Sequence, residues 1–599
     1  ERQVTGGFLG PAHRFGHVAV SGMLRYRSGS LNPRWRNDLF VTFFNTGKVV
    51  RLEPSRTGAT YRATQREFLT SSSREFHPTD VTEDADGSLL VIDTGGWFYR
   101  GCPTSQFAKP DIQGAIYRVR RTGMPTPVDP RGNKIPWEKL AHRERNQYLG
   151  DPRWVVRQRA MTESAARGTA AVPQLRQSLK RGDALTRLGA LWSLSRIAGQ
   201  VTSSQKKDVA TGSRQLLPAA IRDAFHDALA DRSLDIRVAA CHCLALFPDK
   251  SSLAALNARL QTDVAPIRRV AAKALGRIGD PTAVPALLKS LTKASDDSEE
   301  HAIIYALIEI DQAAATARGL QATSSRVRRG ALIALDQMDS KYQVTQETIF
   351  AFLQDSDERL RDSALQILQK NSSWFALTAP MLQTWLLQLP TEAPYHQTMR
   401  KILRFTLQSD AVSQLVGEQL SDPDLPSSTR SLLLTAIAQQ NKVASPASWS
   451  QPLDRLLASG NTSLQMQAVA AIAALRSNQF NARLSAFASD VDQPTELRLA
   501  AVEAIARKTG RLTPESFSYV CGLVDAENLV DAQQRSVRVL SQVSLSAEQM
   551  KSLLPLLQSA GPVELRELIR PYLRSSDRDL AAAFLETMSA ARSFGGVPS

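Results

Sequence analysis

Two patterns of apolar and polar positions divide the chain. Over residues 1–121, β-branched and aromatic runs are broken at Gly, Asn and Asp and show no helical spacing, a pattern that predicts strands. From about Asp151, Ala and Leu recur every three or four residues, as in amphipathic helices. A Pro-rich stretch from Met124 to Trp137 lies between the two. We therefore expect strands over 1–121, a linker over 122–150 and helices over 151–592.

The helical segment is built from a repeated unit. Its clearest copies are DPRWVVRQRAM from Asp151, DRSLDIRVAAC from Asp231, DVAPIRRVAAKALGRIGD from Asp263, DSDERLRDSAL from Asp355 and DQPTELRLAAVEAIA from Asp492. In four of these an Arg lies six residues after the Asp. Most intervals between successive copies are 30 to 39 residues, the length of a helix–turn–helix unit that stacks on its neighbours.

The recurrent Arg marks one position in each repeat. Its copies are Arg157, Arg187, Arg237, Arg268, Arg328, Arg361, Arg430, Arg498, Arg535 and Arg566, with weaker equivalents at Glu299, Arg400 and Gln465. We expect the Asp to cap the helix, with its carboxylate accepting a backbone N–H. We expect the Arg about one and a half turns into the helix. There it can reach the Asp of an adjacent repeat, which predicts a ladder of ion pairs.

The repeats resemble a known family. Their spacing and the phrase RRVAAKALGRIGDPTAVPALLKSL, from Arg268 to Leu291, are similar to HEAT repeats of the phycobilisome-lyase type. The resemblance implies a mainly α fold, a HEAT-type α-solenoid in which helical hairpins form a superhelix. Such repeats are binding surfaces in scaffolds, lyases and nucleic-acid enzymes alike, so the fold does not decide the function.

The segment before the repeats contains two similar copies of a strand pattern. NDLFVTFFN from Asn37 and GKVVRLEP from Gly47 match SLLVID from Ser88 and GAIYRVRR from Gly114, and the preceding segments HVAVSGMLRYRSG and HPTDVTEDADG suit an inner strand. The pattern predicts two blades of a β-propeller. The first copy also has a fourth strand, residues 60–70, whereas the second has none. Since two blades cannot close a ring, we expect an all-β partial propeller whose other blades lie upstream of Glu1.

The blade phrases resemble a dehydrogenase family. FHPTDVTEDADGSLLVID and GAIYRVRR are similar to the end of the soluble glucose dehydrogenase-like propeller. Joined to HEAT repeats, they resemble the putative membrane-bound dehydrogenases of planctomycete-type bacteria, in which a c-type haem module with CxxCH follows the repeats. The most specific phrase is DTGGWFYRGCPTSQFAKPDIQGAIYR, from Asp93 to Arg118. The resemblance implies a fragment of a quinone- or haem-linked dehydrogenase of sugars or alcohols.

A catalytic site would lie where the loops of the second blade meet. Loops that enter the first strand and join the second to the third open on one face of a propeller, where ligands usually bind. His77 is the candidate base, with Asp80 and Asp93 beside it, because an alcohol proton must leave as hydride passes to a cofactor. Arg100 and Lys109 would stabilise anionic groups of the cofactor. Trp97, Tyr99 and Cys102 belong to the same insert.

The same residues also suit a structural interpretation. His77 and Asp80 could be turn residues bonded to backbone groups. The turn EDADG offers Asp84 and Asp86 to a calcium ion, but it equally suits an ordinary acidic hairpin turn. The sequence leaves these alternatives open, and we predict no metal site.

The cysteines indicate core positions. Cys102, Cys241, Cys243 and Cys521 lack CxxC, CxxCH and zinc-finger spacing. On a helix Cys241, His242 and Cys243 point in three directions, so they cannot close around one metal. Because CxxCH is absent, haem c is not expected in this chain. Pyrroloquinoline quinone would be a cofactor of the parent protein, and this chain alone is expected to be inactive.

Charge narrows the choice of partner. The net charge is +15. Residues 1–150 carry 22 Lys and Arg against 14 Asp and Glu, while the repeats mix both signs. A solenoid that binds nucleic acid should concentrate cations along its repeats, so this basic-array alternative is disfavoured. The other two classes are a dehydrogenase fragment that takes a small polar substrate at the propeller and a non-catalytic scaffold that binds a protein partner or neighbouring domain on the solenoid.

Targeting signals are not evident in the sequence. No apolar run approaches the ~18 residues of a membrane helix. The residues after Glu1 lack the basic and then apolar layout of a signal peptide. The dehydrogenase resemblance implies a periplasmic or other extracytoplasmic location, and we expect further sequence at both ends.

Overall fold

The structure is a computed structural model. It describes residues 9–96, 111–124, 126–205, 217–340, 342–388, 393–440, 446–475, 477–524 and 530–590. The chain forms two compact units, Glu1–Val344 and Thr345–Ser599. All the described strands belong to the first unit.

The described strands form two antiparallel sheets. They are β1 (Val20–Arg25), β2 (Leu39–Phe43), β3 (Lys48–Thr57), β4 (Thr60–Thr70), β5 (Pro78–Glu83), β6 (Leu89–Asp93) and β7 (Ala115–Val119). The first sheet has the order β1-β2-β3-β4 and the second the order β5-β6-β7. Each sheet is therefore a meander in chain order. Among the described residues the second sheet lacks a fourth strand, as the sequence indicates.

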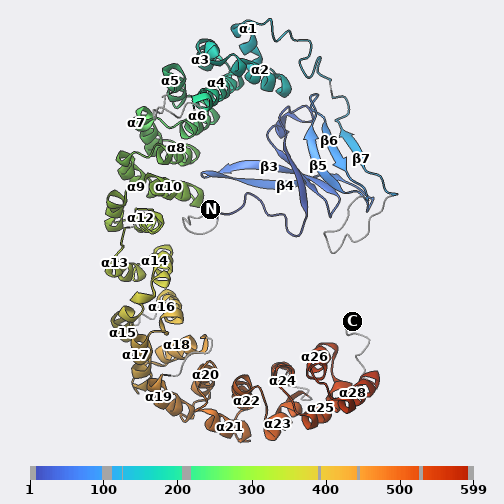
Figure 1. Ribbon diagram of the computed structural model, residues 1–599, viewed down its shortest axis with the longest axis vertical. Helices are drawn as coiled ribbons and strands as arrows, with labels where there is room; N and C mark the ends of the chain where they lie inside the picture. The colour runs from blue at the N-terminus through green and yellow to red at the C-terminus, as the bar shows by residue number, and fades with distance from the viewer. Residues whose placement is uncertain are drawn as a thin grey trace. The chain divides into compact units, whose positions relative to one another are not determined.

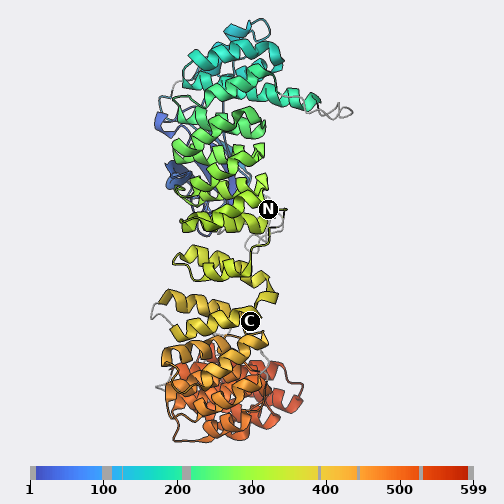
Figure 2. The same cartoon turned by 90° about the vertical axis from the view of Figure 1, so that its left-hand side faces the viewer.

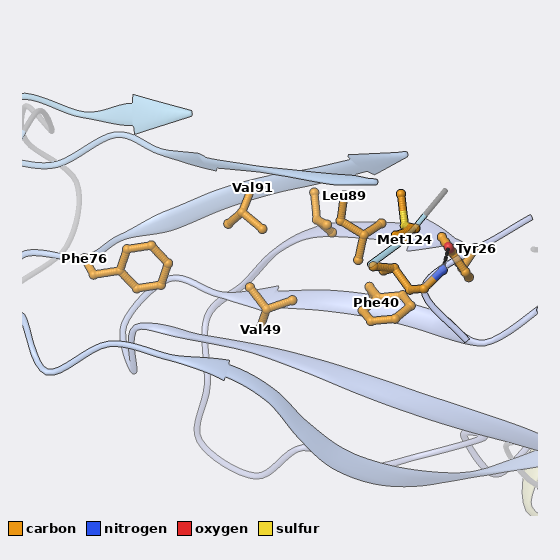
Figure 3. Close-up of a cluster of buried hydrophobic side chains, with 9 residues drawn as sticks. Tyr26, Phe40, Val49, Phe76, Leu89, Val91 and Met124 are labelled. Carbon is orange, nitrogen blue, oxygen red and sulfur yellow. Dashed lines mark hydrogen bonds between the residues drawn. The ribbon is translucent and has the colours of Figure 1, made fainter. Parts of the chain in front are cut away.

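The two sheets share one apolar core. Figure 3 shows Phe40 on β2 and Val49 on β3 facing Leu89 on β6, and all three are fully buried. Tyr26 extends this core, and its hydroxyl donates to the carbonyl oxygen of Gly87 at 2.8 Å. Burying these side chains supplies most of the stability of such a small pair of sheets.

The helices of the first unit follow the strands. They are α1 (His142–Gln147), α2 (Trp154–Ala166), α3 (Val172–Arg181), α4 (Ala184–Gln205), α5 (Ala219–Ala228), α6 (Leu234–Leu246), α7 (Leu253–Thr262), α8 (Ala265–Ile278), α9 (Val284–Leu291), α10 (Asp297–Ile310), α11 (Ala313–Ala317) and α12 (Ser325–Gln337). The even-numbered helices α2 to α12 contact one another in turn and form an inner layer on the side of the sheets (Figure 1). The odd-numbered helices α3 to α11 form the outer layer. Figure 2 shows the helices of this unit stacked one above the next.

Local sequence sets where these helices begin and end. In α8, Pro266 occupies the first turn, where a missing N–H leaves no hydrogen bond unmade. Gly279 ends the helix with a φ of +70°, a left-handed conformation that glycine adopts without strain. Asp296 caps α10 by accepting the N–H of Glu299 at 2.9 Å. The repeats that contain α8 and α10 therefore carry local signals for where these helices begin or end.

The β3–β4 hairpin joins the sheets to the inner helices (Figure 1). At its tip the N–H of Ala59 donates to Oδ2 of Asp296 at 2.6 Å. Gly58 next to it has a φ of +56°, and a Cβ there would collide with Asp296. Arg56 pairs with Asp235 in the first turn of α6 at 2.6 Å. The hairpin is thus held at the N-terminal ends of α6 and α10.

The second unit consists of further helical pairs. Its helices are α13 (Gln346–Leu353), α14 (Glu358–Lys370), α15 (Ala379–Gln388), α16 (Ala393–Thr406), α17 (Asp410–Ser421), α18 (Ser427–Ala438), α19 (Ala447–Leu457), α20 (Thr462–Ala473), α21 (Asn481–Ser489), α22 (Thr495–Thr509), α23 (Pro514–Val524), α24 (Val530–Gln542), α25 (Ala547–Ser559), α26 (Pro562–Leu568), α27 (Arg570–Leu573) and α28 (Arg578–Ala590). Trp449 on α19 is fully buried, and its indole N–H donates to the carbonyl oxygen of Ser413 on α17 at 2.7 Å. Neighbouring repeats are therefore joined by polar as well as apolar contacts.

The repeated Asp does not cap its helix, which corrects the sequence expectation. The N-cap residues of α2, α6 and α14 are Arg153, Ser233 and Asp357, each two positions after the repeated Asp. The carboxylates of Asp151 and Asp231 accept the N–H of these cap residues at 2.8 and 2.7 Å. The Asp therefore closes the turn before the helix, as Asx turns do.

In α2, α4, α6 and α8 the repeated Arg is the fourth residue of its helix and lies in the first turn, not one and a half turns into the helix as the sequence predicts. Nη1 of Arg237 donates to the carbonyl oxygen of Asp231 at 2.8 Å, and Nε and Nη2 donate to the carboxylate of Asp263, in the next repeat, at 3.1 Å each. Arg187 does the same with the carbonyl of Gly182 at 2.8 Å and the carboxylate of Asp231 at 2.9 and 3.1 Å. Each guanidinium joins the turn of its own repeat to the following repeat.

These contacts confirm the predicted ion pair with the Asp of an adjacent repeat for Arg187 and Arg237. Arg268 pairs with Glu299 of the next repeat at 2.6 and 2.9 Å. Arg157 and Arg430 donate to backbone carbonyl oxygens in the turns of their own repeats. In the second unit Arg535 binds both carboxylate oxygens of Glu503 at 2.9 and 2.7 Å. Two-pronged pairs of this kind fix orientation as well as charge, so each pair holds two neighbouring repeats in register.

The mainly α, HEAT-type solenoid is confirmed. The all-β segment consists of two small sheets, and the described residues form no closed ring of blades. Helix α1 falls within 122–150, the segment predicted as a linker. Among the described residues, no helix is both long and apolar enough to cross a membrane.

Candidate functional site

The structure brings two of the predicted catalytic residues together. The backbone N–H of His77 donates to Oδ1 of Asp93 at 2.9 Å, and the same oxygen accepts the N–H of Gly95 at 2.9 Å. Asp93 is buried. Nδ1 of His77 lies 3.0 Å from the carbonyl oxygen of Glu75, and its ring packs against Phe44 with centroids 4.9 Å apart. Asp93 therefore ties the loop after β6 to the start of β5.

The other predicted site residues contribute less to this arrangement. Asp80 is exposed and pairs with Ile92 across β5 and β6. Its carboxylate accepts the N–H of Val81 at 2.8 Å, a local bond. The predicted cofactor ligands Arg100 and Lys109 lie outside the described residues, as do Trp97, Tyr99 and Cys102.

The turn between β5 and β6 binds arginines. Asp84 accepts Nη1 of Arg118 at 2.8 Å and Nη2 of Arg131 at 2.6 Å. Burial alone would raise the pKa of Asp84, but the two guanidinium groups and a backbone N–H hold it below its usual value. Asp86 accepts the N–H and the hydroxyl of Ser88 at 2.9 and 2.6 Å. This arrangement favours the acidic hairpin turn over a calcium site.

A different site lies between the first sheet and the inner helices. A groove of about 840 Å³ is lined by Met23 and Tyr61 from the sheet and by Trp192 on α4 and Val238 on α6. Met23 is 66% exposed and Tyr61 is 42% exposed. Trp192 also lines an adjoining hollow of about 360 Å³ together with Phe247. Contiguous exposed apolar surface of this kind is typical of binding sites.

Polar groups border the groove. Arg56 closes one side, because it pairs with Asp235 and lies 5.1 Å above the ring of Tyr61. His242 on α6 also lines the groove. Burial and the charges of Lys273 and Arg269 on α8 lower the pKa of His242. Its imidazole is therefore neutral near pH 7, and the groove wall there is uncharged.

The cysteines on α6 are core residues. Cys241 and Cys243 are fully buried on either side of His242, as the sequence indicates. Burial raises the pKa of both thiols to about 12. In the part of the chain that the structure describes, no cluster of three or more His, Cys, Asp or Glu side chains is placed to hold a metal ion.

Comparisons with known proteins concern the helical repeats. A family model of HEAT repeats matches residues 222–308, and no curated protein sequence matches the chain. Among solved structures, yeast importin-β (Kap95p) is similar at 12% identity, over 76% of this chain and 72% of that chain, with a TM-score of 0.32.

Two further solved structures are similar to a comparable share of the chain. The karyopherin Kap121p bound to the SUMO protease Ulp1p is 12% identical over 75% of this chain and 56% of its own, with a TM-score of 0.46. A homology model of the AP-3 complex is 9% identical over 76% of this chain and 90% of that chain, with a TM-score of 0.37. At these identities the likeness concerns the fold alone.

Proposed function

We propose that this chain is a non-catalytic HEAT-repeat scaffold that binds a polypeptide partner in the groove between its first sheet and its inner helices. The groove carries the proposal. It is lined jointly by two different parts of one unit, and its volume of about 840 Å³ is large enough for several side chains of a ligand. A partner that covers Met23, Tyr61 and Trp192 would remove apolar surface from water, which favours binding.

The surrounding structure supports a rigid groove. The ion pairs of Arg187 with Asp231 and of Arg237 with Asp263 join α4, α6 and α8, the helices that carry or flank one wall. The β3–β4 hairpin fixes the other wall through Asp296. A site that is already ordered loses little conformational freedom when a ligand binds, so more of the contact energy appears as affinity.

The predicted catalytic residues also favour a scaffold. The carboxylate of Asp93 accepts two backbone N–H groups, and that of Asp80 accepts one. The bond from His77 joins the end of β6 to the start of β5, and the other two are local bonds to the next residues of the chain. The residues that suggest chemistry in the sequence thus have structural roles that need no substrate.

A peptide selection tests the proposal. Random 12-residue peptides displayed on phage are selected against the full chain, and their affinities are measured with purified protein. We expect binding that Trp192→Ala weakens by at least about tenfold, as for a central anchor. Trp374→Ala, which alters a half-buried Trp in the second unit, is the matched control and should leave the affinity unchanged. Peptides that bind both variants as tightly as the wild type would contradict the proposal.

We propose a second function, that of a domain in a sugar or alcohol dehydrogenase. The observation that favours it is the pair of antiparallel meanders with a shared core, which suits consecutive propeller blades. The resemblance to the planctomycete-type family and its extracytoplasmic location belong to this second proposal, with pyrroloquinoline quinone as the cofactor.

Dye reduction tests the dehydrogenase proposal. Because this chain alone is expected to be inactive, the protein encoded by the whole reading frame is incubated with pyrroloquinoline quinone, calcium, sugars or alcohols and an electron-accepting dye. Reduction that depends on the chain and is lost in His77→Ala would support it. Absence of reduction, once quinone binding has been verified by absorbance, would count against it.

A further inference from the structure

We infer that Arg27, Arg36 and Arg157 form a binding site for a phosphate group, supplied either as free phosphate or as a phosphate ester. The site lies where the segment between β1 and β2 faces the start of α2. It goes beyond the proposed scaffold function and does not depend on it, because none of the three arginines lines the groove.

Arg157 is held like the other repeated arginines but lacks their acidic partner. Its Nη1 donates to the carbonyl oxygens of Asp151 and Pro152 at 2.6 and 3.0 Å, in the turn of its own repeat. In Arg187 and Arg237 the same kind of bond fixes the guanidinium, and Nε and Nη2 bind the carboxylate of the next repeat. In the described part of the chain no carboxylate takes that place beside Arg157. Its Nε and Nη2 are therefore left to a ligand whose oxygens can accept both N–H groups.

Two further guanidinium groups face Arg157 from the strands. That of Arg27 lies over the ring of Trp154, 5.0 Å from its centroid. Trp154 and Arg157 are three residues apart on α2 and therefore neighbours on one face of the helix. Nη2 of Arg36 donates to the carbonyl oxygen of Ser28, the residue after Arg27, at 2.9 Å. Burial and the charges of Arg36 and Arg27 lower the pKa of Arg157, as expected where three cations lie together.

Two carboxylates lie near these cations, but they do not cancel the positive charge. The oxygens of Asp151 bind the guanidinium of Arg153 at 2.9 and 2.7 Å, so that pair is neutral. The buried carboxylate of Glu83 accepts two backbone N–H groups of the turn after β1 at 2.7 and 2.8 Å. Both carboxylates partly offset the repulsion that Arg157 experiences. Three guanidinium groups against Glu83 leave a surplus of two positive charges, which matches the charge of about −2 on a phosphate.

A phosphate fits this arrangement better than a carboxylate. Arg27 and Arg36 are exposed, whereas Arg157 is half-buried on the opposite side, so a ligand between them meets donors from two directions. The two oxygens of a carboxylate would both be used by the fork of Arg157. A phosphate has further oxygens for the other two guanidinium groups, whose planar N–H pairs suit them. The three arginines therefore favour phosphate, and an uncharged ligand would leave their charges unpaired.

Phosphorus NMR of small probes tests the inference with the full chain. The probes are inorganic phosphate, phenyl phosphate and the uncharged trimethyl phosphate, and the transverse relaxation of each phosphorus nucleus reports binding. We expect trimethyl phosphate to bind at least about tenfold more weakly than the other two, because it offers no charge to the arginines. Affinity for inorganic phosphate should also fall as NaCl is raised. Tighter binding of phenyl phosphate would identify an ester as the source, and tighter binding of inorganic phosphate would identify the free ion.

Substitutions locate the bound phosphate. Arg157→Ala should weaken binding of inorganic phosphate by at least about tenfold, and Arg157→Lys should not restore it fully, because an ammonium group cannot form the fork. Arg27→Ala combined with Arg36→Ala leaves the bonds of Arg157 in place and should also weaken binding by at least about tenfold. Arg62→Ala combined with Arg74→Ala removes two exposed arginines elsewhere in the first unit. This matched control should change the affinity by less than about twofold, and circular dichroism confirms that each variant retains its helices.

The outcomes separate this inference from the proposed function. Trp192→Ala should leave phosphate binding unchanged, since Trp192 lines the groove. Three results would overturn the phosphate site and leave the scaffold proposal standing: equal binding of trimethyl phosphate, wild-type affinity in both the Arg157→Ala and the Arg27→Ala, Arg36→Ala variants, or an equal loss in the control variant. Loss of phosphate binding in Trp192→Ala alone would place the phosphate in the groove and would also overturn the inference.

Discussion

Replacing Arg268 with Ala should loosen the contact between α8 and α10. Glu299 is fully buried, and its carboxylate accepts Nε and Nη2 of Arg268 at 2.6 and 2.9 Å. It also accepts the N–H and hydroxyl of Ser295 at 2.9 Å each. After the substitution, a buried negative charge keeps only the two Ser295 bonds. Removing one partner of such a buried ion pair lowers the free energy of unfolding by about 3 kcal/mol.

Hydrogen exchange measures this loss where it occurs. The long chain contains two units, so a single unfolding free energy for the whole molecule would mix several transitions. Exchange followed by mass spectrometry reports peptides from α8 and α10 separately. A loss of about 3 kcal/mol corresponds to a roughly 150-fold fall in protection. Peptides from α24, in the second unit, serve as the internal reference and should not change.

Arg269→Ala is the matched control, because it removes the neighbouring guanidinium from the same helix. Arg269→Ala is expected to lower the free energy of unfolding by less than about 0.5 kcal/mol. Glu299→Gln in the Arg268→Ala background should restore part of the protection, since no unpaired charge is then buried. Equal losses in Arg268→Ala and Arg269→Ala, or no rescue by Glu299→Gln, would refute the view that the ion pair holds the repeats in register.

Three further predictions follow from individual contacts. Gly58→Ala should increase hydrogen exchange in β3 and β4, because the new Cβ would collide with Asp296. The control is Gly123→Ala, because Gly123 also has a positive φ but has no atom within 4 Å of the new Cβ. Equal effects of the two substitutions would contradict the steric argument. Burial would raise the pKa of Asp263, but the backbone N–H of Val264 and the guanidinium of Arg237 outweigh it and hold the pKa below the ordinary value. The ionised Asp263 carboxylate therefore stabilises the fold fully above pH ~3.9, and this stabilisation is lost as the pH falls through the lowered pKa. The protection of peptides from α6 and α8, corrected for the intrinsic pH dependence of hydrogen exchange, should accordingly fall less between pH 5 and pH 3 in Asp263→Asn than in the wild type, and parallel falls would argue against this. Iodoacetamide at pH 8 should label Cys521, which is partly exposed, before Cys241 and Cys243, whose burial raises the thiol pKa to about 12; labelling of all three at one rate would show that α6 is less buried than described.

The repeats could be predicted in detail because their signals are local. Even the weak equivalent Gln465 bonds the backbone before its helix, since its side-chain amide donates to the carbonyl oxygen of Leu457, the last residue of α19, at 2.9 Å. The sequence predicts Asp231 as the N-cap of α6, whereas the N-cap is Ser233, two residues later. An Asp that closes a turn and an Asp that caps a helix look alike in sequence, because both precede the first helical residue.

The groove could not be predicted from the sequence. Met23, Tyr61, Trp192 and His242 are far apart along the chain, and each by itself is an unremarkable residue of a strand or helix. They meet because the β3–β4 hairpin docks on α6 and α10, and the sequence carries no local signal for that contact. Conversely, Asp93 suggests chemistry because a carboxylate after a strand often binds a ligand, yet its partners are backbone N–H groups.

Photo-crosslinking from the groove tests the central claim most directly. Benzoylphenylalanine replaces Met23 in one version of the full chain and Leu585, a similarly exposed residue of α28, in another. A peptide from the phage selection is added, the mixture is irradiated, and the adducts are mapped by mass spectrometry. Crosslinking from position 23 and none from position 585 is the predicted result. Equal yields at both positions, or a yield only at 585, would contradict a groove that binds the partner.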